Sequence, residues 1–165
     1  MKKQCMVLLV ENNAGVLARI SSLFMQRGFN IDSLTVSSTE DPDISRITIM
    51  ATGDQKTFSQ IMKQTGKLVE TKTIFSVEPA STVIRELLLV KISVADADNE
   101  ALRSIIDDYG ATVLDTTSDC LVAELAATSS KIDDFLEAIA HFKMLEMCRS
   151  GAIAMERGNV VRDFK

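Results

Sequence analysis

The sequence is poor in the residues that build metal and thiol-based sites. Its 165 residues include one histidine, three cysteines and no tryptophan. Because structural zinc sites draw on several cysteine and histidine ligands, a metal centre is not expected. The cysteines, Cys5, Cys120 and Cys148, are odd in number and widely spaced, which argues against a disulfide framework. Their apolar, strand-like surroundings favour small inert side chains over reactive thiols.

A catalytic constellation is also missing. The lone histidine, His141, has no nucleophile or orienting acid tied to it by the sequence, as a general base would need. Neither GxGxxG nor GxxxxGK[ST] occurs, so no nucleotide-binding fingerprint is present. These absences predict a protein that is not itself an enzyme.

Long apolar runs and concentrated basic charge are absent as well. The net charge is −5 and the cations are scattered, whereas a nucleic-acid binder needs a basic face. No apolar run approaches the roughly 20 residues of a membrane span. The N-terminal apolar stretch Cys5–Val10 is too short for a signal peptide and ends at Glu11. We therefore expect a cytoplasmic protein with neither a nucleic-acid nor a membrane partner.

What the sequence does contain is regular apolar periodicity. In the first half it predicts alternating strands and helices, with Gly28 ending the first helix and Gly53-Asp54 opening the second. The expected strands are Met6–Val10, Ile31–Ser37, Arg46–Ala51 and Glu70–Val77. This β-α-β-β-α-β order is the ferredoxin-like arrangement, with two helices on one face of a four-stranded antiparallel sheet.

The pattern breaks at Pro79–Ser81 and then repeats. The second half is expected to hold a helix ended by Gly110, a helix across Ile132–Ile139, and four strands. These strands are Leu87–Val94, Thr112–Thr116, Leu121–Leu125 and a bent Lys143–Met155. The predicted fold class is therefore α+β, with two tandem ferredoxin-like domains: residues 1–78, a linker at 79–84, and residues 85–165 ending in a polar tail. Since each small half has a marginal core and open sheet edges, we expect pairing between halves or a homodimer.

One loop carries a binding signal, the segment Glu11–Leu17 between the first strand and the first helix. Gly15 allows close approach of backbone to a ligand, and free N–H groups at a helix N-terminus suit a carboxylate. Asparagine side chains both donate and accept, as recognition of an α-amino acid requires. The alternative is an ordinary asparagine N-cap with a turn glycine. A second glycine-marked turn, Gly28–Asn30, is open to the same two interpretations, since it could be a plain helix stop.

Five segments together resemble the small subunits of acetohydroxyacid (acetolactate) synthase. They are LLVENNAGVLARISSLFMQRGFNIDSLTV at Leu8–Val36, DPDISRITIMATGD at Asp41–Asp54, KQTGKLVE at Lys63–Glu70, RELLLVKI at Arg85–Ile92 and RSG at Arg149–Gly151. The resemblance spans essentially the whole chain. The order and length of these segments make it far more specific than an isolated Asn-x-x-Gly motif.

The resemblance implies an N-terminal ACT domain that pairs edge to edge in a homodimer and binds valine, or another branched-chain amino acid, at the interface. The implied ligand residues are Asn12 and Gly15, with Ala14 and Val16 contributing backbone, and Asn30 with Ile31 from the partner chain. The C-terminal domain would help to dimerise and would engage the catalytic large subunit. That subunit, not this chain, would hold thiamine diphosphate, magnesium and FAD. This chain would raise its activity and confer feedback inhibition.

Two other classes of protein remain open. A stand-alone tandem-ACT regulator, acting on transcription or on another enzyme, would need no thiamine-dependent partner. A small ferredoxin-like enzyme of the acyl-phosphatase type would need a basic cradle for phosphate. The loop Glu11–Leu17 contains no arginine, which disfavours that enzyme.

Overall fold

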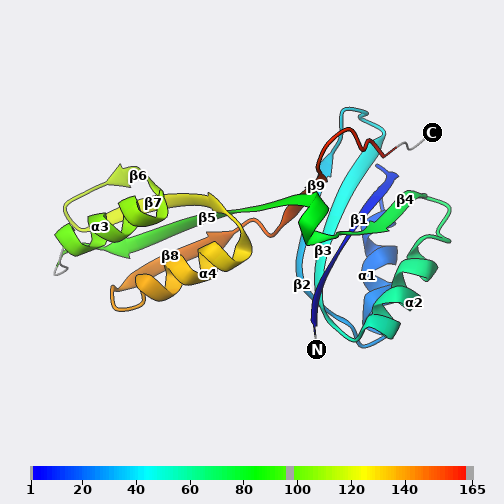
Figure 1. The fold of residues 1–165 in the computed structure, drawn as a ribbon, viewed down its shortest axis with the longest axis horizontal. Coiled ribbons are helices and arrows are strands. Elements are labelled where there is room, and N and C mark those ends of the chain that lie inside the picture. The colour runs from blue at the N-terminus through cyan, green and yellow to red at the C-terminus, as the bar shows by residue number, and fades with distance from the viewer. Residues whose placement is uncertain (1, 96–98, 163–165) are drawn as a thin grey trace. The chain divides into compact units, whose positions relative to one another are not determined.

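The computed structural model describes residues 2–95 and 99–162. The chain divides into two compact units. The first unit combines the chain up to Ile84 with the segment from Ala152 onward, and the second unit runs from Arg85 to Gly151. Each has its own apolar core, and each is described separately below (Figure 1).

The first unit is a four-stranded antiparallel sheet with two helices on one face (Figure 1). The strands lie in the order β2-β3-β1-β4, which confirms the predicted β-α-β-β-α-β arrangement. Its elements are β1 (Lys2–Glu11), α1 (Val16–Gln26), β2 (Asn30–Ser38), β3 (Ile44–Gly53), α2 (Gln55–Thr65) and β4 (Thr71–Ser76).

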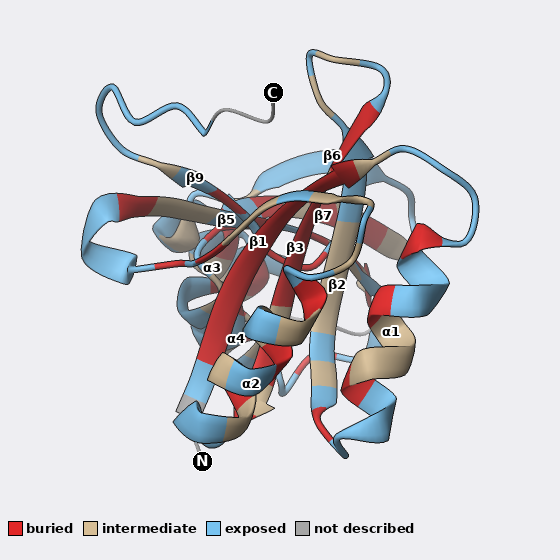
Figure 2. Cartoon of the chain, turned by 90° about the vertical axis from the view of Figure 1, so that its right-hand side faces the viewer, coloured by how far each residue is buried: buried red, intermediate tan, exposed pale blue. Residues whose placement is uncertain are grey.

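The central strand β1 is buried on both faces, as Figure 2 shows together with its neighbour β3. Met6, Leu8 and Val10 point to the helices and pack against Ile20 and Phe58 in the main core. The intervening residues Cys5, Val7 and Leu9 point to the other face and are just as buried. This explains the unbroken apolar run, since a strand covered on both faces cannot alternate with polar residues.

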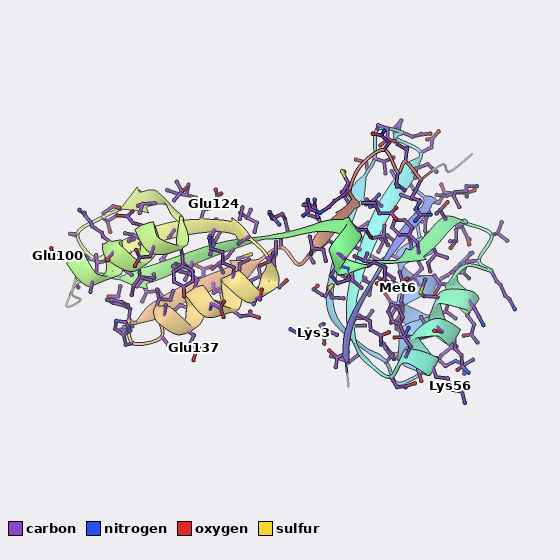
Figure 3. The ribbon with its side chains drawn as sticks, viewed as in Figure 1. Lys3, Met6, Lys56, Glu100, Glu124 and Glu137 are labelled. Atoms are coloured by element: carbon purple, nitrogen blue, oxygen red, sulfur yellow. The ribbon has the colours of Figure 1, made fainter. Side chains whose placement is uncertain are left out.

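The helix ends follow from local chemistry. Gly28 and Gly110 adopt positive φ angles of 62° and 69°, the left-handed conformation expected after a helix. The side chain of Asp54 accepts a hydrogen bond from the Thr57 backbone N–H at 2.9 Å and so caps α2, as predicted. Charged side chains such as Lys56 on α2 extend into solvent (Figure 3).

The second unit repeats the same topology. Its strands lie in the order β6-β7-β5-β8, and α3 and α4 pack against one face of the sheet to form a separate core. The elements are β5 (Thr82–Ser93), α3 (Asn99–Tyr109), β6 (Thr112–Thr116), β7 (Cys120–Ala127), α4 (Ser129–Ala138) and β8 (Met144–Arg149). The prediction of two tandem ferredoxin-like domains is thus confirmed.

The domain boundaries differ from those expected from the sequence. The predicted linker 79–84 contains one 3-10 turn, η1 (Pro79–Ser81), followed by the first residues of β5. The single bent strand predicted at Lys143–Met155 is two strands, β8 and β9 (Ile153–Glu156), separated by a turn in which Gly151 has a φ of 80°. The first unit, not the second, contains the chain from Ala152 onward.

The chain returns to the first unit after Gly151. The physical reason lies on the face of the first sheet that α1 and α2 do not cover. Ala154 of β9 packs there against Cys5, Val7 and Phe75 in a second apolar cluster. Strand β9 also pairs with β5, and the Arg157 backbone N–H donates to the Ser81 carbonyl at 2.8 Å. The predicted polar tail therefore begins with a segment that covers apolar surface.

In the second unit a charged cluster joins the first and last strands. The Glu86 carboxylate accepts hydrogen bonds from Arg149 Nε at 2.8 Å, Arg149 Nη2 at 2.9 Å and Ser129 Oγ at 2.8 Å. Arg149 Nη1 also donates to Asp133 Oδ1 at 2.7 Å. The bonds from Arg149 lower the pKa of Glu86 below its ordinary value of 4.5. The cluster therefore stabilises the folded state above about pH 4.5, and this contribution is lost as the pH falls through the lowered pKa.

Replacing Arg149 by methionine should destabilise the second unit by about 3 kcal/mol, because the buried Glu86 would lose its charged partner. The matched control is Lys91→Met, which removes an exposed pair with Glu146 at 3.5 Å and should cost less than about 1 kcal/mol. Hydrogen exchange of β8 peptides, followed by mass spectrometry, measures both. Equal exchange rates in the two variants would contradict a stabilising role for the cluster.

Candidate functional site

The predicted binding loop lies at the end of the first sheet where β1 finishes. Residues 12–15 are all exposed, and Gly15 takes the N-cap position of α1 with a φ of 89°. No side chain caps this helix, so the backbone N–H groups of Leu17 and Ala18 in its first turn lack a capping acceptor. The positive end of the helix dipole thus faces solvent beside a glycine, a geometry suited to an anion.

Asn12 is fixed by the hairpin between β2 and β3 and does not cap the helix. Its Nδ2 donates to the Pro42 carbonyl and its Oδ1 accepts from Ser45 Oγ, both at 3.0 Å. Its backbone N–H donates to the Asp43 carbonyl at 2.7 Å. The alternative interpretation of an asparagine N-cap is therefore wrong for Asn12. It is also wrong for Asn13, whose side chain donates to Glu11.

Each side-chain group of Asn12 has one hydrogen-bonding position left, since an amide offers two N–H donors and two acceptor lone pairs. Asn12 can therefore hold the hairpin and contact a ligand at the same time. Ala14 is exposed and contributes backbone to the loop surface. Val16 is 5% exposed because its side chain packs into the core, which leaves only its backbone for the site.

Asn30 and Ile31 lie at the opposite end of the same sheet. Glu11, just before the loop, pairs with Ile44 of β3, whereas Asn30 pairs with Thr52. Eight residues of extended chain separate Ile44 from Thr52, or about 27 Å. One chain thus brings together four of the six predicted residues, namely Asn12, Ala14, Gly15 and Val16. It does not bring Asn30 and Ile31 to them.

The charged side chains around the loop are already paired. Lys72 Nζ donates to Glu11 Oε1 at 2.6 Å and lowers the pKa of that carboxyl group, while Arg19 pairs with Glu70. The attraction of this loop for an anion therefore comes from backbone N–H groups and not from a free cation. Such a site is selective by shape as well as by charge, because the N–H directions are set by the helix.

Cys5 and His141 are not placed next to a catalytic partner among the described residues. Burial raises the pKa of the Cys5 thiol to about 12, so it stays protonated. His141 lies against the ring of Phe142, with ring centroids 4.0 Å apart. In residues 2–95 and 99–162, no group of three or more histidine, cysteine or acidic side chains is placed to hold a metal ion. None of the described helices has the length and apolar character needed to cross a membrane.

Comparison with known proteins covers both units. Residues 6–73 match the profile of the AHAS small subunit-like ACT domain, and residues 85–158 match that of the small subunit of acetolactate synthase. The acetolactate synthase isozyme 3 small subunit of Escherichia coli is 37% identical over 160 residues, which covers 96% of this chain and 98% of that protein. This chain belongs to the family of acetolactate synthase small subunits.

Two further relatives agree with the family assignment. A protein of Methanothermobacter thermautotrophicus named "Probable acetolactate synthase small subunit" is 43% identical over 155 residues, covering 92% of this chain and 90% of the relative. The crystal structure of the acetolactate synthase small subunit from Thermotoga maritima superposes with a TM-score of 0.87 at 33% identity. That superposition covers 97% of this small subunit and all of the other chain.

Sequence reasoning missed the residues that position the loop of this small subunit. Ser45 anchors Asn12 although it lies 33 positions away along the chain. The sequence signal was weak, because β3 also contains Arg46, Thr48 and Thr52, and it is the structure that shows Ser45 to be only 6% exposed. A buried polar side chain needs a hydrogen-bond partner, but the sequence does not tell which partner it finds.

Replacing Asn12 by alanine should loosen the β2–β3 hairpin, because two side-chain hydrogen bonds to Pro42 and Ser45 disappear. Backbone amides of residues 39–45 should exchange with deuterium about five- to tenfold faster, corresponding to about 1 kcal/mol. Asn13→Ala is the control, since that side chain bonds only to Glu11 among the described residues. Unchanged exchange in Asn12→Ala would show that the hairpin does not depend on Asn12.

Proposed function

We propose that this chain is the non-catalytic regulatory subunit of a cytoplasmic acetolactate synthase. It binds the catalytic large subunit, raises its activity and confers feedback inhibition by valine or another branched-chain amino acid. The supporting observation is the full-length relationship to proteins named small subunits of acetolactate synthase, with an ACT-type domain at residues 6–73. Thiamine diphosphate, magnesium and FAD would belong to the catalytic subunit, and none to this chain.

The effector in this proposal binds at the N-terminus of α1. Its carboxylate receives hydrogen bonds from the uncapped N–H groups near Gly15. The remaining donor and acceptor positions of Asn12 complete the recognition of its polar groups. The helix fixes the directions of these N–H donors before the ligand arrives, which lowers the ordering cost expected on binding.

The partner subunit supplies the rest of the site in a homodimer. Strand β2 is an edge strand, with Asn30 at one end and Ser38 at the other. Ser38 pairs with Ser45, so its end of the sheet is the one that carries Asn12. A two-fold axis that pairs β2 antiparallel with the partner's β2 would therefore bring the partner's Asn30 to the Asn12 loop.

This geometry explains why the site is incomplete in one chain. The symmetry of the dimer would bridge the length of β3 from Ile44 to Thr52, about 27 Å, which lies between the two ends of the sheet. Apolar residues beside the partner's Asn30, such as the partner's Ile31, would contact the branched side chain of the effector. Because one methylene changes binding by only about 1–3 kcal/mol, valine, leucine and isoleucine are expected to overlap as effectors.

Feedback by this site is tested with Gly15→Asp. The substitution introduces a negative charge at the helix N-terminus and strains a backbone with a φ of 89°. In a holoenzyme reconstituted with the catalytic subunit, the valine concentration for half-inhibition should rise at least about tenfold, while activation by the small subunit persists. The matched control is Gly110→Asp, at another positive-φ glycine with open space around it, which should keep normal inhibition.

Two outcomes would contradict the proposal. If Gly15→Asp retained full valine sensitivity, the effector site would lie elsewhere. If the wild-type chain neither bound nor activated the catalytic subunit, the regulatory function itself would be refuted.

The dimer is tested with Val36→Lys, which places a charge on the edge strand β2 where Val36 is 41% exposed. Analytical ultracentrifugation should show a shift from dimer to monomer, and valine binding should be lost with it because the partner's Asn30 is removed. The control, Val69→Lys, adds the same charge to an exposed valine in the α2–β4 connection and should stay dimeric. A dimeric Val36→Lys protein would exclude pairing through β2.

A further inference from the structure

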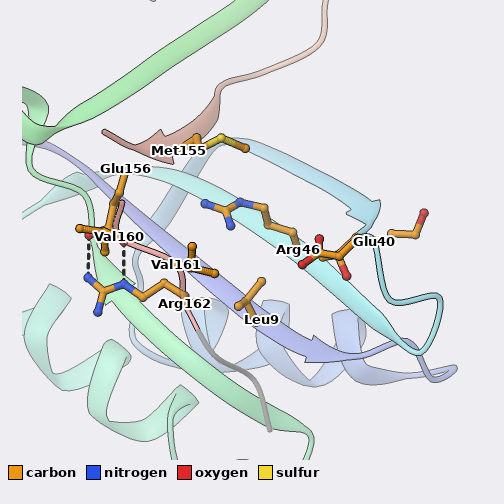
Figure 4. A pocket seen from close by; sticks show the side chains of 10 residues that line it. Leu9, Glu40, Arg46, Met155, Glu156, Val160, Val161 and Arg162 are labelled. Carbon is orange, nitrogen blue, oxygen red and sulfur yellow. Dashed lines mark hydrogen bonds and ion pairs between the residues drawn. The ribbon is translucent and has the colours of Figure 1, made fainter. Parts of the chain in front are cut away.

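A cavity lies in the first unit on the sheet face away from α1 and α2 (Figure 4). Its volume is about 410 Å³, within the range of pockets that hold small ligands. Leu9 of β1 and Arg46 of β3, which pair with each other, line it from the sheet. Residues 38–40 at the end of β2 and the C-terminal segment from Met155 to Arg162 line the rest.

Two of the four charged groups at this cavity neutralise each other. Arg162 donates two hydrogen bonds of 2.6 Å to the carboxylate of Glu156, drawn as dashed lines in Figure 4. The same guanidinium lies 4.5 Å from the centroid of the Phe75 ring, a cation–π contact that fixes the C-terminal segment. This pair therefore shapes the cavity, and the Glu156 carboxylate also acts electrostatically on Arg46.

The other two charged groups, Arg46 and Glu40, retain binding capacity. Arg46 has five N–H donors, and among the described residues one hydrogen bond engages them, from Nη2 to the Ala154 carbonyl at 2.6 Å. Glu40 is exposed, and no ion pair joins it to Arg46 or to another cation in the described residues. The cavity thus presents one cation and one anion that attract each other electrostatically without a hydrogen bond between them in the described residues.

Apolar side chains line the space between these charges and the C-terminal segment. Leu9 is 2% exposed and forms part of the sheet wall, whereas Val160 and Val161 are 53% and 85% exposed. These two valines expose apolar surface to water beside the cavity. A ligand that covered this surface would gain favourable free energy from its burial.

We propose that this cavity is a second binding site for an α-amino acid with an apolar side chain. The carboxylate of the ligand pairs with Arg46, its ammonium group with Glu40, and its side chain packs on Leu9, Val160 and Val161. A zwitterion suits the site better than a simple carboxylic acid, because an anion alone would leave Glu40 unpaired beside a second negative charge. This site is separate from the effector site at Gly15, and its existence does not depend on that proposal.

The test uses the full-length Gly15→Asp protein, in which the other site is disabled, with ¹³C-labelled valine methyl groups and leucine as the probe. Titration with leucine should shift the methyl resonances of Val160 and Val161 in a saturable manner. Glu40→Gln should weaken this binding at least about tenfold, the effect expected for one charged hydrogen bond. No hydrogen bond joins Glu40 to the described part of the C-terminal segment, so this variant is expected to keep the fold.

Two controls make the result specific. Glu137→Gln removes an exposed carboxylate from α4 in the second unit and should leave the shifts unchanged (Figure 3). The compound 4-methyl-2-oxopentanoate, which has the leucine side chain and carboxylate but no ammonium group, should bind at least about tenfold more weakly than leucine. Absence of methyl shifts with leucine, or equal affinity in Glu40→Gln, would overturn the proposal. Neither result would affect valine inhibition through Gly15.

Discussion

Burial of the open face of the first sheet is the constraint on which much of this structure depends. Helices α1 and α2 cover only one side, yet Cys5 and Val7 of the central strand are apolar on the other. A four-stranded sheet cannot leave such residues in water without losing the hydrophobic stabilisation that holds a small domain together. Ala154 of β9 packs on this face together with Val77 and Ile84, which accounts for the return of the chain to its first unit after the second.

The return of the chain also places charged side chains of the first sheet next to those of the C-terminal segment. Arg46 donates to the Ala154 carbonyl, and Arg162 stacks on Phe75 while bonding to Glu156. A cavity with charged and apolar walls results, although the residues concerned lie more than 100 positions apart in the chain. The C-terminal segment of this small subunit therefore serves as part of the ACT unit and not as a loose tail.

The β2–β3 hairpin connects the two regions to which we assign amino-acid binding. Asn12 bonds to Pro42 and Ser45 of this hairpin, and Arg46, the next residue along β3, points to the opposite face of the sheet. A small movement of the hairpin would therefore shift both the Asn12 loop and Arg46. An effector changes activity only by favouring one arrangement of the protein over another.

The sequence by itself determined the repeated β-α-β-β-α-β order, the glycines at the helix ends and the family, because these depend on local periodicity, local backbone conformation and residue order. It also singled out the loop with Asn12 and Gly15, where the structure has a helix N-terminus without a side-chain cap. Three features become visible only in the folded chain: Asn12 anchors a hairpin, Asn30 lies at the far end of the sheet, and the residues from Ala152 onward belong to the first unit. These features depend on which distant residues meet, and hydrophobic burial can be satisfied by many partners that a linear pattern does not distinguish.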